Sequence, residues 1–263
     1  MIKKLLKSSQ QFAIVDVPKF ILTWSLIPSK NNGVIFWGHL GLGDAISQAC
    51  IIEKLLLDNR VVVVPSKTRN YDFLKSTYGT WDGVILEKVN DNPWWENLEI
   101  LKLKLKHRFQ VKVVGHHLLD SNWAEQEISL NEQFNRIAGI PPKKLKSTKL
   151  RDTCELNTQA QPPKQKYIFV DHHPGTDREI PTKILKDAMN RGFEILENDT
   201  SIPLYRLIKI LDNAHEIHVV ASAPLCLALT TDAKCKKKYY YRTKGQGPVS
   251  SAAYPDWIDI DLR

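Results

Sequence analysis

Residues 33–57 read GVIFWGHLGLGDAISQACIIEKLLL. The short apolar run at 34–37 is typical of a buried strand, and the loop after it holds three glycines and ends at Asp44. Residues 45–57 then carry apolar side chains at helical spacing. A strand, a glycine loop and a helix in this order predict the first unit of a parallel α/β sheet.

The same alternation continues along the chain, which indicates crossover helices between parallel strands. In the first half we predict strands at 60–64, 83–86 and 111–114, and helices at 71–78, 97–108 and 131–138. In the second half we predict strands at 167–171, 193–196, 216–220 and 238–241, and helices at 182–191, at 203–212 and after Ser222.

The stretch between the halves, residues 141–166, is rich in Lys, Thr, Gln and Pro and shows little periodicity, as expected of a linker. We therefore predict an α/β fold of two Rossmann-like domains that face each other across a cleft, where ligands of open α/β sheets bind. The expected divisions are an N-terminal segment at 1–29, a first domain at 30–145, a linker at 146–165 and a second domain at 166–263.

Composition narrows the class of protein. With 263 residues, 43% of them hydrophobic and 25% charged, the chain can form two compact halves and is not a disordered protein. The net charge of +8 favours anionic partners: nucleotides, phosphorylated sugars, nucleic acid or an acidic membrane surface. Four scattered cysteines without a CxxC pair indicate neither a zinc site nor a disulfide framework, which fits a reducing compartment.

The first 28 residues are basic and apolar, with Lys3 and Lys4 beside Leu5 and Leu6. They lack the apolar run and cleavage site of a secretory signal, and no segment approaches the roughly 20 apolar residues of a membrane span. Two interpretations stay open: a helix packed on the core, or a segment lying on a membrane surface. We expect a cytoplasmic protein with a possible site of peripheral contact at the inner face of a membrane.

The glycine loop is the first candidate site. Gly41 and Gly43 allow close approach of a ligand and present backbone amides at a helix start. Their spacing is neither the GxGxxG of a dinucleotide site nor a Walker loop. Taken alone, Asp44 is either a reactive carboxylate or a cap of the following helix, and His39 is either a base or a structural hydrogen-bonding group.

The loop HLGLGD at 39–44 resembles the glycine-rich loop of heptosyltransferase-like glycosyltransferases with the GT-B fold. The resemblance implies that Asp44 accepts the proton of the acceptor hydroxyl, that Gly41 and Gly43 shape the turn, and that His39 is the substitute base. It also implies that the first domain binds the acceptor and that the second binds a nucleotide-sugar donor.

Two stretches of the second half carry the same resemblance. VDHHPGTDR at 170–178 is similar to the family's donor-phosphate loop, which makes Thr176, Arg178 and Lys183 donor-binding candidates, with an ordinary surface loop as the alternative. LDNAHEIHVVASAP at 211–224 is similar to the family's nucleotide-binding turn. The amides of Ser222 and Ala223 could hold a phosphate, although Ala221 replaces the family's acidic residue.

Other candidates are weaker. Glu216 is either structural or reaches the donor ribose. Adjacent histidines in extended chain point to opposite faces, so we expect one of each pair, His117 and His173, to line the cleft rather than to bind metal. The Asp-x-Asp string formed by Asp259 and Asp261 lies at the C-terminus instead of after an early strand, and we expect no metal cofactor.

These expectations combine into one function. The chain is expected to be an inverting, metal-independent glycosyltransferase that moves a sugar from a nucleotide-sugar donor to a glycan or glycolipid acceptor. The alternative is a non-catalytic nucleotide- or nucleic-acid-binding α/β module. No recognised nucleic-acid-binding motif accompanies the basic run at 234–238, so we expect no nucleic-acid partner.

Overall fold

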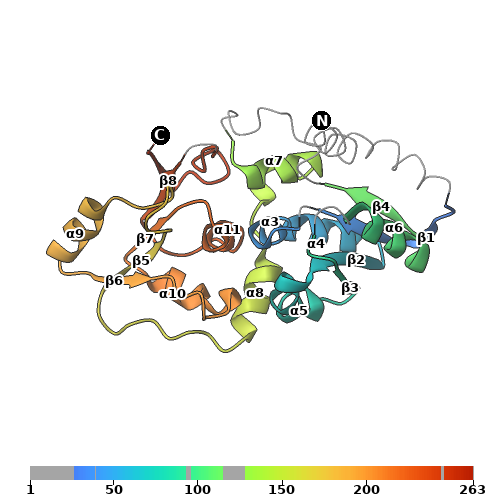
Figure 1. Ribbon diagram of the computed structural model, residues 1–263, viewed down its shortest axis with the longest axis horizontal. Coiled ribbons are helices and arrows are strands. Elements are labelled where there is room, and N and C mark those ends of the chain that lie inside the picture. Colours follow the sequence, from blue (N-terminus) through green and yellow to red (C-terminus); the bar gives the residue numbers. More distant parts are fainter. Residues whose placement is uncertain (1–26, 39, 93–95, 115–127, 244–245, 263) are drawn as a thin grey trace, which may run out of the picture.

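A computed structural model of the chain describes residues 27–38, 40–92, 96–114, 128–243 and 246–262. Its strands form two sheets that are parallel throughout (Figure 1). The four-stranded sheet has the order β3-β2-β1-β4, formed by β1 (Lys30–Trp37), β2 (Val61–Lys67), β3 (Val84–Val89) and β4 (Phe109–Val113). The five-stranded sheet has the order β6-β5-β7-β8-β9, formed by β5 (Tyr167–Asp171), β6 (Glu194–Glu197), β7 (Glu216–Val219), β8 (Lys238–Arg242) and β9 (Trp257–Asp261).

In each sheet the strand order reverses at one point, where consecutive strands lie on opposite sides of a central strand. In the first sheet the chain runs outward from β1 to β3 and then returns to the other side of β1 as β4. In the second sheet β6 and β7 lie on opposite sides of β5. Ligands of open α/β sheets bind beyond the carboxyl ends of the strands at such points. The loops after β1, β5 and β7 are therefore the places to look for a site.

Helices connect the strands and cover the sheets. The α-helices are α3 (Leu42–Ser47), α4 (Ala49–Asp58), α5 (Tyr71–Ser76), α6 (Glu96–His107), α7 (Leu130–Ile137), α8 (Thr148–Leu156), α9 (Thr182–Asn190), α10 (Ile208–Asn213) and α11 (Ala223–Thr230). Short 3-10 segments are η1 (Thr68–Asn70), η2 (Tyr78–Thr80), η6 (Pro142–Lys144) and η7 (Leu204–Arg206). The helix expected at 45–57 is thus two helices, which meet at Gln48.

Alternation along β1 explains how both faces of the first sheet are buried. Ile35 and Trp37 point to one face, where Ile100 and Leu103 of α6 pack against them. Val34 and Phe36 point to the other face and join a larger core with α3, α4 and α5. Parallel strands need such cover on both faces, because neither face can be left to solvent.

The larger core lies between the two sheets. Phe169 of β5 and Val219 of β7 belong to the same cluster as Val34 and Phe36 of the first sheet. On the outer face of the second sheet, Ile168 and Val170 pack against α9. In Figure 1, α3 and α11 lie in the middle of the molecule, with one sheet on either side. The predicted α/β fold with two sheets is confirmed.

The segment expected to be a linker, 146–165, contains the helix α8. Leu150 and Cys154 of α8 are fully buried, and its N-cap Ser147 bonds to Glu53 of α4. On the same helix, Thr153 accepts a hydrogen bond from Trp81 Nε1 at 2.9 Å. A segment with so few apolar residues folds as a helix because surfaces from both halves cover it.

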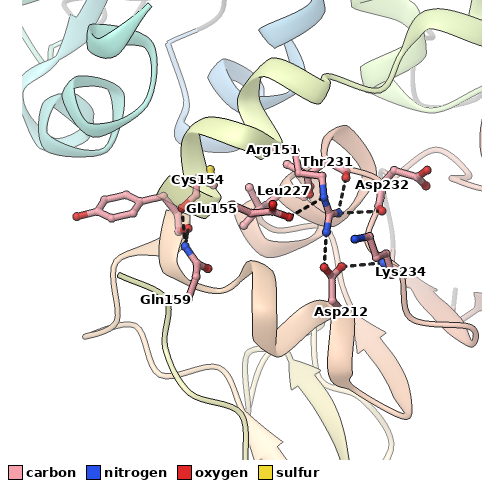
Figure 2. Close-up of polar contacts among 10 residues, drawn as sticks. Arg151, Cys154, Glu155, Gln159, Asp212, Leu227, Thr231, Asp232 and Lys234 are labelled. Atoms are coloured by element: carbon pink, nitrogen blue, oxygen red, sulfur yellow. Dashed lines mark hydrogen bonds and ion pairs between the residues drawn. The ribbon is translucent and has the colours of Figure 1, made fainter. Parts of the chain in front are cut away.

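Arg151 ties α8 to the second half, as Figure 2 shows. Its guanidinium donates to the carbonyl oxygens of Thr231 at 2.9 Å and Asp232 at 3.2 Å, just beyond α11. It also forms ion pairs with Asp212 of α10 and, at 2.9 Å, with Glu155. Burial lowers the pKa of Arg151, but the carboxylates of Asp212 and Glu155 together hold it above its ordinary value. The guanidinium thus fixes α8 against α10 and α11.

We expect Arg151→Ala to lower the free energy of unfolding by about 2 kcal/mol, because Asp212 and two carbonyls lose a charged partner. Chemical denaturation at neutral pH measures this. The matched control is Lys102→Ala, which removes a 60% exposed ammonium group from its pair with Glu99 on α6 and should cost less than about 1 kcal/mol. Equal losses in the two variants would contradict the role of Arg151.

None of the helices within the described ranges has the length and apolar character needed to cross a membrane.

Candidate active site

The loop after β1 leads directly into α3 and presents its first turn. Gly41 is the N-cap residue, with extended backbone angles of φ −68° and ψ 150°, and no side chain caps the helix. Asp44 lies in the first turn, where its negative charge interacts favourably with the helix dipole. The capping alternative for Asp44 therefore does not describe this helix start, because the cap position belongs to Gly41.

The turn after β7 leads into a second helix, α11. Ser222 is the N-cap of α11, and its Oγ accepts a hydrogen bond from the Leu225 amide at 3.4 Å. Pro224 occupies the first turn, where its missing N–H costs nothing. The first amides of α11 therefore face the region beyond the sheet, as the amides of phosphate-binding helices do.

One pocket joins the two helix starts. Asp44 of α3 and Ser222 of α11 line the same cavity, which has a volume of about 80 Å³, enough for a few waters or a group of phosphate size. Figure 1 shows α3 and α11 side by side between the sheets. The other lining residues come from α3, α7, α11, β8 and the segment before β9: Ser47, Ser129, Leu130, Asn131, Ala221, Leu225, Cys226, Leu229, Tyr240, Gln246, Gly247, Pro248 and Val249.

Two titratable side chains of this lining, Cys226 and Tyr240, have raised pKa values. Burial raises the pKa of the Cys226 thiol to about 12, and the nearby Asp44 charge adds to the effect. Burial also raises the pKa of Tyr240, although Arg242 and Arg178 act in the opposite direction. Both groups therefore keep their protons at neutral pH. Among the pocket-lining residues that the structure describes, Asp44 carries the carboxylate able to accept a proton.

The loop after β5 is ordered by its own hydrogen bonds. Thr176 Oγ1 donates to the His173 carbonyl at 2.7 Å and accepts from the Arg178 amide at 3.0 Å, while Gly175 adopts a left-handed φ of 75°. Arg178 lowers the pKa of Tyr240, which lines the pocket, but Arg178 is not itself a lining residue. His173, Thr176 and Lys183 are exposed and are not among the residues that line it.

Glu216 is not one of the residues that line this pocket. It is the first residue of β7, at the amino end of the strand, and is 1% exposed. Its carboxylate accepts two hydrogen bonds from Arg191, at 2.7 and 3.0 Å, and further bonds from Lys237 at 3.2 Å and His218 at 3.1 Å. These contacts favour the structural alternative for Glu216, because the loops expected to bind the donor lie at the opposite ends of the strands.

The remaining candidate residues are two histidines and the Asp-x-Asp string. His39 and His117 lie outside the described residues. Asp259 accepts hydrogen bonds from the amides of Val249 and Ser250, and Asp261 pairs with Arg242 at 2.7 Å, so this Asp-x-Asp string fixes the C-terminal segment to the sheet. Within the described ranges, no group of three or more His, Cys, Asp or Glu side chains is arranged to hold a metal ion.

Sequence reasoning missed several pocket residues. Ser47 and Cys226 could have been found, because they follow Asp44 and Ser222 by three and four positions on predicted helices and so share their faces. Ser129 was signalled by the Ser-x-x-Glu start of the helix at 131–138. Tyr240 and Gln246 gave no local signal, since only the folding of the second sheet brings them to this place.

Comparison with known proteins places this fold among glycosyltransferase structures. The fold resembles that of the iron-containing dodecameric glycosyltransferase TibC from enterotoxigenic E. coli, with 11% identity and a TM-score of 0.54. The match covers 81% of this chain and 59% of TibC. A glycosyl transferase family 9 protein from Veillonella parvula matches over 89% and 88% of the two chains, with 8% identity and a TM-score of 0.52. The E. coli heptosyltransferase WaaC with ADP-2-deoxy-2-fluoro heptose matches over 87% and 92%, with 10% identity and a TM-score of 0.51.

At identities this low the likeness concerns the fold. The expected resemblance to heptosyltransferase-like, GT-B-type structures is confirmed at that level. The chain spans 59% of the length of TibC, but most of the length of the other two proteins. No family model matches the sequence, and no curated protein matches it. The activity of this chain must therefore be argued from its own pocket.

Proposed function

We propose that this protein is an inverting, metal-independent glycosyltransferase that takes a sugar from a nucleotide-sugar donor. The main support for this proposal is the shared pocket, which is lined by Asp44 of the first half and by Ser222 at the start of α11 in the second half. Glycosyl transfer needs this combination, because the acceptor hydroxyl must lose a proton while a diphosphate leaves with additional negative charge.

In the proposed reaction, the acceptor oxygen forms a bond to the anomeric carbon from the face opposite the diphosphate. Its proton passes to Asp44, and the electrons of the breaking carbon–oxygen bond leave with the nucleoside diphosphate. The amides of Ser222 and Ala223 at the start of α11 stabilise that charge, and Arg178 adds a cation from the loop after β5. Inversion at the sugar carbon follows from the single displacement.

Several features support these roles. The pocket has room for a group of phosphate size at the first turn of α11. The similar fold of WaaC was solved with ADP and with an ADP-sugar analogue bound, which is consistent with a nucleotide donor here. A glycan or glycolipid is the proposed acceptor, and the basic residues of the N-terminal segment are the proposed contact with a membrane surface.

The first test is a thermal-shift panel of UDP, GDP, ADP, CMP and their sugar conjugates, in EDTA and again with Mn²⁺. A ligand that binds only the folded chain raises Tm by mass action. We expect a shift with one nucleoside diphosphate in EDTA, followed by transfer of its sugar to an acceptor. Binding without transfer would favour the non-catalytic binding module, and no shift with any compound would refute the proposal.

Arg178→Ala should weaken binding of that nucleoside diphosphate by roughly tenfold, since a charge-assisted hydrogen bond to phosphate contributes about 1.5 kcal/mol or more. Isothermal titration measures the change. Arg206→Ala is the control, because its Nε donates to the Thr158 carbonyl and Arg206 does not line the pocket. An unchanged affinity in Arg178→Ala would remove this residue from the donor site.

A further inference from the structure

The two helix starts at the pocket touch through a glycine. A Cβ atom built on Gly43 of α3 would lie 3.0 Å from Cys226 Sγ of α11, 3.6 Å from Ala223 Cα and 3.8 Å from Cys226 Cβ. The first of these distances is tighter than nine in ten real Cβ contacts, and the next-nearest atom, Ala223 Cα, belongs to the backbone of α11. Any side chain at position 43 must therefore displace either the thiol or the helix.

The thiol also contacts the next turn of α3. Cys226 is hydrogen-bonded to Ser47 on the next turn of α3, and burial keeps it protonated by raising its pKa to about 12. Gly43 and Ser47 lie one turn apart on the same face of α3 and both meet Cys226, and Asp44 follows Gly43 directly in sequence. A displacement of α11 at this contact changes the position of Asp44 relative to Ser222.

We propose that Gly43 and Cys226 are positioning residues, whose contact sets the separation between the Asp44 carboxylate and the amino end of α11. This inference rests on the proposed function, in which a sugar is transferred across that separation. Neither residue reacts with substrate. They act through Asp44 and the first turn of α11, where a displacement of even 1 Å can cost roughly a hundredfold in rate.

The contact is tested by measuring Tm for Gly43→Ala in the natural background and in Cys226→Ala. Alanine is the better helix former, so an unobstructed substitution in α3 should raise Tm. We expect Gly43→Ala to lower Tm beside Cys226 and to raise it once the thiol is removed, with Cys226→Ser giving an intermediate result. A change of the same sign and size in all three backgrounds would refute the contact.

The positioning role is tested with the nucleoside diphosphate that the panel identifies and its sugar conjugate. We expect Gly43→Ala to lower kcat at least about tenfold while the Kd of the diphosphate changes by less than about threefold. In the Cys226→Ala background the kcat penalty of Gly43→Ala should fall below about threefold. An equal penalty in both backgrounds, or none, would overturn the proposal.

Gly79→Ala is the matched control. Its Cβ would lie 3.2 Å from Leu86 Cδ1, in a similarly tight contact that does not involve the pocket. It should change Tm by the same amount whether or not Cys226 is present, and it should leave kcat unchanged. Absence of nucleotide binding and transfer in the natural protein would refute both the proposed function and the positioning role, and the Tm cycle would then identify a purely structural contact.

Discussion

Asp44→Asn should reduce sugar transfer by about a thousandfold or more, because removal of a general base typically costs between about 10² and 10⁴ in rate. The asparagine keeps the size of the side chain and loses its ability to accept the hydroxyl proton. Asp44 lies in the pocket with Ser222, whereas the proposed phosphate contacts belong to α11 and Arg178. The affinity for the nucleoside diphosphate should therefore change by less than about threefold.

The control for Asp44→Asn is Asp72→Asn. Asp72 also lies in the first turn of a short helix, α5, and is exposed, so its loss removes a similar interaction with the helix dipole away from the pocket. Both variants should lose less than about 1 kcal/mol of stability, and only Asp44→Asn should lose transfer. If Asp44→Asn loses diphosphate binding together with transfer, Asp44 has a structural role and the proposed reaction is wrong.

Glu216→Gln should lower the free energy of unfolding at neutral pH by about 3 kcal/mol, because it leaves Arg191, Lys237 and His218 around a neutral amide. The hydrogen bonds from Arg191 are the main reason that the pKa of Glu216 falls to about 2 from an ordinary value of 4.5, against the opposing effect of burial. A difference of this size corresponds to about 3 kcal/mol of stabilisation in the charged state.

The same pKa shift gives the pH dependence its sign. A carboxyl group whose pKa is lower in the folded chain stabilises the fold above pH 4.5, and this stabilisation is lost as the pH falls from 4.5 toward 2. The difference in unfolding free energy between the natural protein and Glu216→Gln should therefore shrink across this range. Urea denaturation at a series of pH values measures it.

Glu194→Gln is the control for Glu216→Gln, since Glu194 is exposed on β6, the edge strand of the same sheet. It should have no effect larger than about 0.5 kcal/mol at any pH in the series. If Glu216→Gln shows the same small, pH-independent effect, the buried ionic cluster does not stabilise the second sheet. Because Glu216 lies at the amino end of β7, diphosphate binding should survive in this variant under conditions where it is folded.

Much of the fold could be predicted from local pattern. The apolar runs that become β1 and β5, and the helix start after Ser222, each depend on residues within one or two turns of each other, so a short window of sequence contains the information. The same holds for the glycine loop before Asp44. Strand β9 was missed, because its alternation of Asp and Ile at the chain end reads as a polar tail.

The helix α8 could not be predicted from local sequence pattern. Its buried positions, Leu150 and Cys154, are few, and the surrounding Lys, Thr and Gln are typical of a linker. The helix is stabilised by partners distant in sequence: Trp81, which bonds to Thr153, and Asp212, which pairs with Arg151. No window of sequence contains such pairs, so tertiary contacts override the weak local preference.

For the candidate site, local sequence pattern was enough to place Asp44 after a glycine loop and Ser222 after a buried strand, each at a helix start. It could not show that these starts share a pocket, that Cys226 meets Gly43 there, or that Glu216 belongs to a buried ion cluster at the far end of its strand. Helix starts and strands follow from neighbouring residues, whereas a pocket depends on which buried faces pack together across the whole chain.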